Sequence, residues 1–432
     1  MKWFLVLSLL ITTKGFAVNY INQGGEPYYT AINSTEAQVQ FEHWVEINSY
    51  RQPVKWLVFN QIEQQLAHLF GPLGAAEFAA VPKTDHRFEI GRTEKINNQT
   101  FRVHYSYTGT FAVRMNRAKT IDLIIPNNPD QIFSAGVVGK TNPCTDSHYQ
   151  SEGDFWYFWN PYQEGCPLKE GIDYEIVTAS MVRLPNVKRS FPEYERLADQ
   201  DQILRMSLFF GMDKPTKSPD PRTSKDINAL NYRRTARDLK KLGFEVTEQK
   251  NNQTYFLEIY EKNYAGDFGI KNIRLTVYFG PTGISEQSGQ FHKFLKNTLE
   301  NEAIMIYDGH SGLGGHLDLE SIEISLGQKI KFPLEKYQIL FFNSCSSYPY
   351  YNTQYFARKM TQTDERGSKN MEIMTNGLAT YFHTISNSNM AVLFVLDSYA
   401  ANGVRTSYQE IAKAIDSDNL FGINGDEDNP KN

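Results

Sequence analysis

Two patterns of hydrophobic and polar positions divide the chain near residue 200. In the first part, residues 56–70 carry apolar side chains at helical spacing, and this segment stops at Gly71-Pro72, a pair typical of a helix end. Shorter runs follow that have the composition and length of strands. We predict strands over 88–90, 100–107, 110–114 and 120–125. Residues 18–200 are therefore expected to form an α+β, strand-rich N-terminal domain.

From residue 203 onward, strand-length apolar runs alternate with helical segments. The predicted strands cover 203–210, 255–260, 273–279, 303–307, 337–342, a short run from Ile373, and 390–396. The predicted helices cover 225–242, 290–300, 354–360, 378–385 and 407–415. Such alternation favours an α/β domain over 203–415, in which a mostly parallel sheet carries helices on both faces. We expect residues 416–432 to form a flexible polar tail.

The first 17 residues have the features of a cleavable secretory signal. Lys2 supplies a positive charge, Trp3 to Ile11 form a short apolar core, and Gly15 and Ala17 are the small residues of a cleavage site. No later segment is apolar over the roughly 18 residues that a membrane-spanning helix needs. We therefore expect an exported protein, periplasmic or secreted, with no transmembrane segment once the signal is removed.

Composition excludes two classes of protein. Of the 432 residues, 41% are hydrophobic and 13% are aromatic, which is too apolar for a disordered chain. The formal net charge is −5, and the chain has no run of five or more basic residues, so nothing indicates a nucleic-acid partner. A chain of this length is expected to fold into two domains or more.

The three cysteines have different expected fates in an oxidising compartment. Cys144 and Cys166 can close a short disulfide loop, which leaves Cys345 unpaired. An unpaired cysteine in an exported protein is a reactive thiol, an intermolecular bridge or a buried inert side chain. Inside the predicted loop, five consecutive aromatic residues run from Phe155 to Trp159. They predict either a strand packed on both faces or a contact surface for glycans or extended peptides.

A histidine and a cysteine follow two of the predicted buried strands. His310 lies in DGHSGLGG after the run 303–307, and Cys345 lies in NSCSS after the run 337–342. Ligand sites in open α/β sheets lie beyond the carboxyl ends of the strands. If the two strands are parallel neighbours, the imidazole and the thiol face one cleft, and a thiol needs a nearby base because the thiolate is the nucleophile. Backbone N–H groups of Ser311 and Cys345 would then supply an oxyanion hole.

These two segments resemble the catalytic motifs of the caspase-like cysteine peptidases, which include caspases, metacaspases, gingipains, legumain and separase. YDGHSG is similar to the metacaspase form Tyr-Ser-Gly-His-Gly, and FNSCSS is similar to the metacaspase Asp-Ser-Cys-His-Ser-Gly and the separase Gly-Cys-Ser-Ser. The likeness covers about 203–415. It implies a caspase-like fold for the C-terminal half, with His310 as general base and Cys345 as nucleophile. It also implies hydrolysis of peptide or protein substrates through a thioester, with no metal and no cofactor.

Two positions depart from the pattern of that family. Ser311 replaces the Gly that normally follows the histidine, although a backbone N–H is still present. Asn343 stands in the substrate pocket where metacaspases carry an Asp that helps to select a basic residue, so the resemblance implies no preference for Arg or Lys. Asp397, which follows the predicted strand 390–396, is the candidate for a compensating charge in that pocket.

Two other functions are compatible with the same residues. A caspase-like fold without activity would serve as a binding protein of the envelope. A metal-dependent hydrolase would use Asp308, His310, His316 and Asp318, which lie in one glycine-rich loop. The role of the N-terminal domain stays open between an inhibitory pro-domain, a substrate-binding domain and a cell-wall-binding domain.

Overall fold

The computed structural model describes most of the chain. The described residues are 27–67, 69, 80–129, 144–145, 159–214, 219–283, 289–380, 382–416 and 419–425. The predicted signal, residues 1–17, and the aromatic residues Phe155 to Phe158 lie outside them. Within the described ranges, no helix combines the length and the apolar character that crossing a membrane requires.

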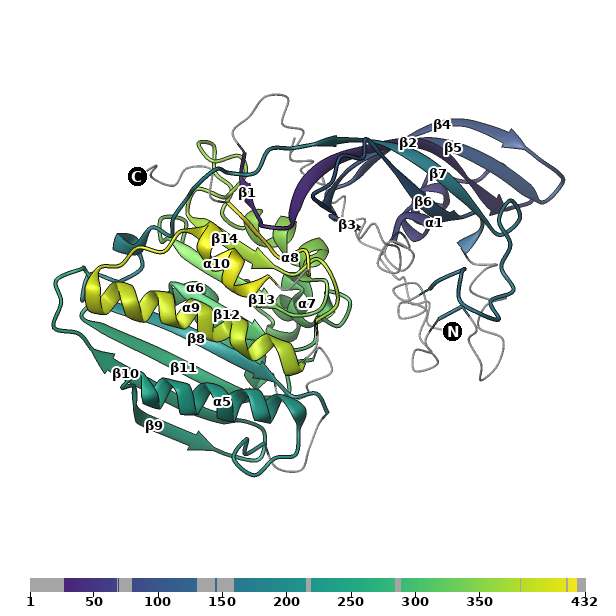
Figure 1. Ribbon diagram of the computed structural model, residues 1–432. Helices are drawn as coiled ribbons and strands as arrows, with labels where there is room; N and C mark the ends of the chain where they lie inside the picture. The colour runs from purple at the N-terminus through teal and green to yellow at the C-terminus, as the bar shows by residue number, and fades with distance from the viewer. Residues whose placement is uncertain are drawn as a thin grey trace.

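The chain forms a mixed α/β structure built on two large sheets (Figure 1). The larger sheet has nine strands in the order β1–β15–β14–β13–β12–β8–β11–β10–β9. Its strands span Tyr29–Thr30 (β1), Ile203–Gly211 (β8), Glu245–Asn251 (β9), Phe256–Asn263 (β10), Asn272–Gly280 (β11), Ile304–Asp308 (β12), Gln338–Asn343 (β13), Met371–Thr375 (β14) and Gly422–Asn424 (β15). The central strands from β14 to β11 are parallel, whereas the two outer strands on each side pair antiparallel. The sheet is therefore mixed, with a parallel centre.

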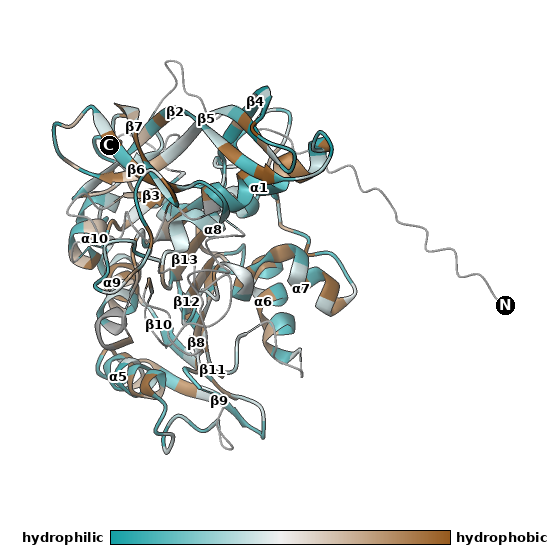
Figure 2. Cartoon of the chain, turned by 90° about the vertical axis from the view of Figure 1, so that its right-hand side faces the viewer, coloured by the Kyte–Doolittle hydropathy of each residue, from teal (hydrophilic) through white to brown (hydrophobic). Residues whose placement is uncertain are grey.

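Helices cover both faces of this sheet. Figure 2 shows α5, α9 and α10 on one side and α6 and α7 on the other, and α8 joins the second group through Tyr351 and Tyr355. The helices span Ile227–Lys241 (α5), Gln290–Asn301 (α6), Leu319–Leu326 (α7), Ser347–Phe356 (α8), Phe382–Asn402 (α9) and Tyr408–Ile415 (α10). Side chains alternate between two cores, because Ile304 and Ile306 of β12 join one cluster while Met305 and Tyr307 join the other.

Three predictions for this domain differ from the structure. The apolar run 390–396 lies in the middle of helix α9 and is not a strand, since a short apolar run is compatible with either element. The predicted helix 354–360 begins earlier, as α8 at Ser347. The C-terminal segment is not a free tail throughout, because Phe421 is fully buried and β15 pairs with β14 and β1.

The N-terminal domain is built on the second sheet. Its strand order is β3–β5–β2–β7–β6, and β4 pairs with β5. The elements span Ser34–Asn48 (β2), Lys55–Ala67 (α1), Ala80–Pro82 (β3), Arg87–Lys95 (β4), Thr100–Arg114 (β5), Thr120–Pro126 (β6) and Tyr174–Arg183 (β7). The two strands predicted over 100–107 and 110–114 form the single strand β5, which pairs with β2 along its whole length.

The predicted disulfide is confirmed, since Cys144 and Cys166 are bonded. Trp159, the last residue of the aromatic stretch, is fully buried against Ile124, Leu168 and Tyr174. Of the two alternatives for the aromatic stretch, Trp159 therefore fits packing in a core and not an exposed surface for glycans or peptides. The other four aromatic residues lie outside the described ranges.

The two domains are not separated at residue 200. β1 belongs to the nine-stranded sheet, although it precedes the whole N-terminal sheet in the chain. Tyr194 and Leu197 also pack into the core of the C-terminal domain. Consequently the C-terminal domain needs residues from both ends of the chain.

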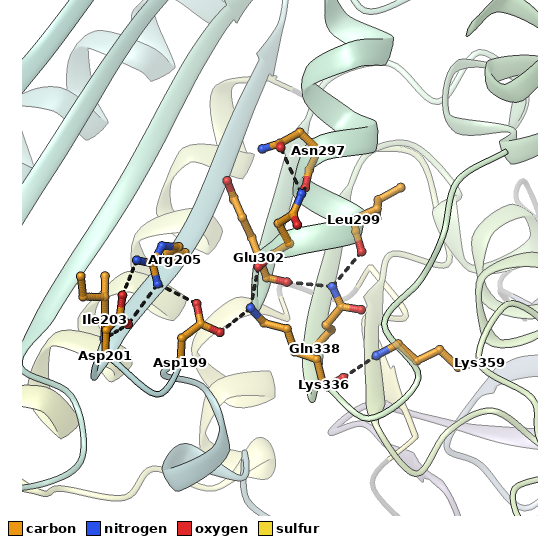
Figure 3. A network of polar contacts seen from close by, with 11 residues as sticks. Asp199, Asp201, Ile203, Arg205, Asn297, Leu299, Glu302, Lys336, Gln338 and Lys359 are labelled. Carbon is orange, nitrogen blue, oxygen red and sulfur yellow. Dashed lines mark hydrogen bonds and ion pairs between the residues drawn. The ribbon is translucent and has the colours of Figure 1, made fainter. Parts of the chain in front are cut away.

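A polar network closes the amino edge of the nine-stranded sheet (Figure 3). Lys336 donates to Asp199 at 2.7 Å, and Gln338 donates to the backbone carbonyls of Leu299 and Glu302 at 3.1 and 2.7 Å. The Glu302 carboxylate accepts from the Ser207 hydroxyl at 2.6 Å. Glu302 precedes β12, Gln338 begins β13, and Ser207 lies in the middle of β8. The network therefore links β8 to the starts of β12 and β13, the two strands that lead to His310 and Cys345.

Candidate active site

His310 and Cys345 lie at the same edge of the nine-stranded sheet. β12 and β13 are parallel neighbours, and their register pairs Asp308 with Asn343, the last residue of each strand. His310 and Cys345 each follow that pair by two positions. Because hydrogen-bonded strands run about 4.8 Å apart, both residues lie beyond the same ends of two adjacent strands. The sequence left open whether the two strands are parallel neighbours, and the structure shows that they are.

Cys345 lies in the sharp turn between β13 and α8. The next residue, Ser346, has a φ of 41°, a left-handed conformation that residues other than glycine rarely adopt. α8 begins at Ser347, and the N-terminal end of a helix favours a negative charge. The thiol donates to the carbonyl oxygen of Thr380 at 3.2 Å and accepts from its N–H at 3.4 Å. Cys345 is partly exposed and carries a free thiol.

His310 is held by groups on three sides. Its Nε2 lies 3.1 Å from a carboxylate oxygen of Asp213, and the two side chains are 44% and 31% exposed. The ring of Phe382 packs edge-on at a centroid distance of 5.1 Å, and the Tyr307 hydroxyl donates to the His310 carbonyl at 2.7 Å. With Nε2 engaged by Asp213, Nδ1 is the ring nitrogen left for proton transfer.

The backbone on either side of His310 is fixed by close contacts. Ser311 is buried, and its carbonyl accepts from the Tyr351 hydroxyl at 3.0 Å and from His316 N–H at 3.1 Å. A Cβ at Gly309 would lie 2.8 Å from the Tyr307 hydroxyl oxygen and 3.3 Å from the Cα of Gly211, so only glycine fits there. A fixed backbone is the condition under which N–H groups of Ser311 and Cys345 would be preorganised as an oxyanion hole.

Asn343 belongs to a buried amide network beneath the site. It is 1% exposed; its amide donates to Asn389 at 2.8 Å and accepts from Asn376 at 3.2 Å. Asn389 in turn donates to the Asp308 carboxylate at 2.5 Å. Burial raises the pKa of Asp308 to about 7, against the hydrogen bond from Asn389. A side chain so enclosed does not face a substrate, so the predicted pocket role of Asn343 is not supported.

Asp397 lies at the other edge of the sheet. It is in α9, fifteen positions after Phe382, which corresponds to about 22 Å along a helix. Its carboxylate accepts from Lys262 and from the Tyr264 hydroxyl, at the end of β10 and just beyond it. The proposed charge in the substrate pocket is therefore wrong, because the segment that was predicted to be a strand is a helix that carries Asp397 away from the site.

The four residues of the metal alternative do not gather around one point. Asp308 is fully buried against Asn389, and Asp318 caps α7 by accepting from Ser321 N–H at 2.8 Å. Burial lowers the pKa of His316 to about 4. Across the described ranges, no group of three or more His, Cys, Asp or Glu side chains is placed to hold a metal ion. The metal-dependent alternative has no ligand set in this part of the chain.

A surface pocket of about 400 Å³ adjoins the loop that follows His310. It is lined in part by Leu313 and Gly314 of that loop, Tyr350 of α8, and Thr84 of the N-terminal domain. Gly314 has a φ of 88°, and a Cβ there would lie 2.8 Å from the Tyr350 ring. The pocket therefore lies where the two domains meet, next to the loop that follows His310, and its lining includes neither His310 nor Cys345.

Two residues of the site were not predicted from the sequence. Asp213 follows the predicted strand 203–210 and so meets the same strand-end criterion that selected His310 and Cys345. Thr380 had no such signal, since it lies in a loop whose approach to Cys345 depends on the packing of the whole domain.

Comparison with known protein families, curated proteins and solved structures finds no significant match to this chain.

Proposed function

We propose that this protein is an exported cysteine peptidase of the caspase-like type that cleaves peptide or protein substrates with Cys345 and His310. The observation that carries the proposal is the register of β12 and β13, which gives the two residues the same offset beyond neighbouring strand ends. The Gly-His and Ser-Cys motifs supply the residue types, and the register supports the proposal by placing both residues past the ends of adjacent strands.

In the proposed reaction, Cys345 loses its proton to His310 and attacks the carbonyl carbon of the scissile peptide bond. The C–N bond breaks, His310 gives the proton to the leaving amine, and an acyl thioester remains on Cys345. A water molecule then attacks the thioester, giving one proton to His310, and the carboxylic acid leaves as the thiol is restored. Backbone N–H groups of Ser311 and Cys345 stabilise the oxyanion of each tetrahedral intermediate.

Asp213 is the positioning residue for His310 in this proposal. Its carboxylate at Nε2 fixes the ring orientation and stabilises the imidazolium that forms when the thiol is deprotonated. The 3.1 Å contact and the partial exposure of both side chains support a modest contribution.

The disulfide between Cys144 and Cys166 supports a location outside the cytoplasm. Disulfides form and persist in oxidising compartments and are rare in the cytoplasm. The proposed location also depends on the signal segment that the sequence predicts.

The test is cleavage of a mixed peptide library by the purified chain, with products identified by mass spectrometry. Wild type is compared with Cys345→Ala, His310→Ala and the control His86→Ala, which removes another His–carboxylate pair, with Glu63 at 3.2 Å. Cleavage that is lost in the first two variants and retained in the control is the expected result. No cleavage by wild type, or cleavage that persists in Cys345→Ala, would overturn the proposal. Inhibition by a chelator but not by a thiol reagent would favour a metal-dependent hydrolase.

A further inference from the structure

The N-terminal domain packs directly on the segments that hold Cys345. An apolar cluster joins Val81 of β3 and Ala112 of β5 to Tyr348 of α8, with Leu378 at its margin. Tyr348 follows Cys345 by three residues, and the Leu378 carbonyl accepts from the N–H of Ser346 at 3.0 Å. Both the helix and the loop that border the thiol therefore rest on the other domain.

A buried carboxylate lies at the centre of this contact. Glu36 of β2 is 1% exposed, and the same oxygen, Oε1, accepts from Lys83, from the Tyr348 hydroxyl at 2.8 Å and from Asn424 of β15 at 3.0 Å. Lys83 is also buried and donates to the Tyr28 hydroxyl at 2.7 Å. We name these five residues, Tyr28, Glu36, Lys83, Tyr348 and Asn424, the Glu36 cluster.

The geometry of the Glu36 cluster leaves α8 little freedom. A buried carboxylate is costly unless donors satisfy it, so the arrangement that supplies all three donors is strongly favoured. One of these donors is Tyr348 in the first turn of α8, and a second link is close by, where the Thr84 hydroxyl donates to the Pro349 carbonyl at 2.8 Å. A shift of α8 would break both contacts and would move the turn that carries Cys345.

We propose that the N-terminal domain is a permanent part of the catalytic unit, in which the Glu36 cluster positions Cys345 through Tyr348. The expected effect on peptide cleavage rests on the proposed function. The expected effect on the reactivity of the Cys345 thiol does not depend on it. The inference assigns the N-terminal domain a supporting role rather than that of an inhibitory pro-domain. Removal of an inhibitory segment raises activity, whereas loosening this contact is expected to lower it.

The test is the variant Tyr348→Phe in the full chain. It keeps the ring and its packing and removes the donor to Glu36. Its matched control is Tyr260→Phe, which also removes a hydroxyl from a fully buried ring. The Tyr260 hydroxyl likewise donates to a buried carboxylate, that of Glu258, at 2.6 Å. Tyr260 is in β10, several strands away from β13 in the sheet. Two measurements are made: kcat and KM on a cleaved peptide, and the rate of Cys345 alkylation by iodoacetamide.

We expect kcat of Tyr348→Phe to fall roughly tenfold with KM changed less than about twofold, because small displacements of a reacting group are costly while substrate contacts persist. We expect alkylation to slow severalfold and Tyr260→Phe to match wild type in both measurements. Equal rates for Tyr348→Phe and wild type would overturn the inference, and so would an equal loss in both variants, which would indicate general destabilisation. If wild type cleaves no peptide, the proposed function fails, and the alkylation rates still decide whether the Glu36 cluster positions the thiol.

Discussion

Replacing Asp213 by asparagine isolates the charge that faces His310. The variant keeps an oxygen acceptor of the same size at Nε2, so the ring orientation is preserved while the electrostatic stabilisation of the imidazolium is lost. In the proposed reaction this imidazolium forms each time Cys345 is deprotonated. The substitution therefore acts on the transition state more than on the binding of the substrate.

The magnitude follows from the distance and the exposure of the pair. The two groups are 3.1 Å apart, but 44% of the His310 side chain and 31% of the Asp213 side chain are exposed to solvent. Hydrogen bonds to charged groups contribute about 1.5–3 kcal/mol when buried, and exposed ion pairs contribute about 0.2–1 kcal/mol. We take about 1 kcal/mol for this half-exposed pair, which corresponds to a roughly fivefold loss of kcat/KM.

The assay is peptide cleavage under conditions where kcat/KM is measured directly, with Asp220→Asn as the control. Asp220 is in the segment that follows β8 as well, but its partner is Arg222 at 2.6 Å. A loss of about fivefold in Asp213→Asn, with little change in the control, agrees with a positioning role. Unchanged kcat/KM would refute the reasoning, and a loss of a thousandfold or more would show that Asp213 acts in the chemistry itself.

Three further predictions concern stability and the backbone near the site. Burial raises the pKa of Glu302 to about 7 from its usual 4.5, so the folded state holds this proton more tightly and the unfolding free energy falls as pH rises between these values. Glu302→Gln should remove about 3 kcal/mol of that pH dependence, measured by urea denaturation at pH 5 and pH 8. The same change in unfolding free energy between the two pH values in wild type and variant would contradict it. Replacing Cys144 and Cys166 by serine should cost about 3 kcal/mol of unfolding free energy, because the loop that they close spans 22 residues; an unchanged urea midpoint would contradict this. Gly314→Ala should slow peptide cleavage and lower the melting temperature, since the backbone has a φ of 88° and the new Cβ would lie 2.8 Å from the Tyr350 ring; Gly171→Ala, with a φ of 77° and no atom within 4 Å of its Cβ, separates the clash from the backbone strain.

The parallel centre of the sheet was predictable because its strands carry a strong local signal. β12 and β13 are buried on both faces, so each is a continuous apolar run, and the polar residues after each run mark its carboxyl end. The strand-end rule then selects His310 and Cys345 without knowledge of the strand order. The sequence does not show that β12 and β13 are neighbours or how their residues pair, and the structure shows both.

Elements that depend on contacts distant in the chain were not predictable in the same way. The apolar run within α9 has seven residues, a length at which a buried helix and a buried strand have the same pattern. β1 and β15 have two and three residues and no pattern of their own; each exists because its partner supplies hydrogen bonds. β9 is exposed along its whole length, so its residues show no alternation at all.

Asn343 and Cys345 are only two positions apart, yet the structure gives them different surroundings. Both are polar or reactive residues that follow the same apolar run, and the sequence places both at the strand end. Register decides between them: Asn343 still pairs with Asp308 inside the ladder and is enclosed by Asn376 and Asn389, whereas Cys345 lies two positions further, where the chain has left the sheet. The buried amides fix the strand ends, and the turn beyond them carries the partly exposed Cys345. Under the proposed function, we expect substrate preference to come from residues other than the last ones of the strands, and the pocket lined in part by Gly314 and Tyr350 is one candidate.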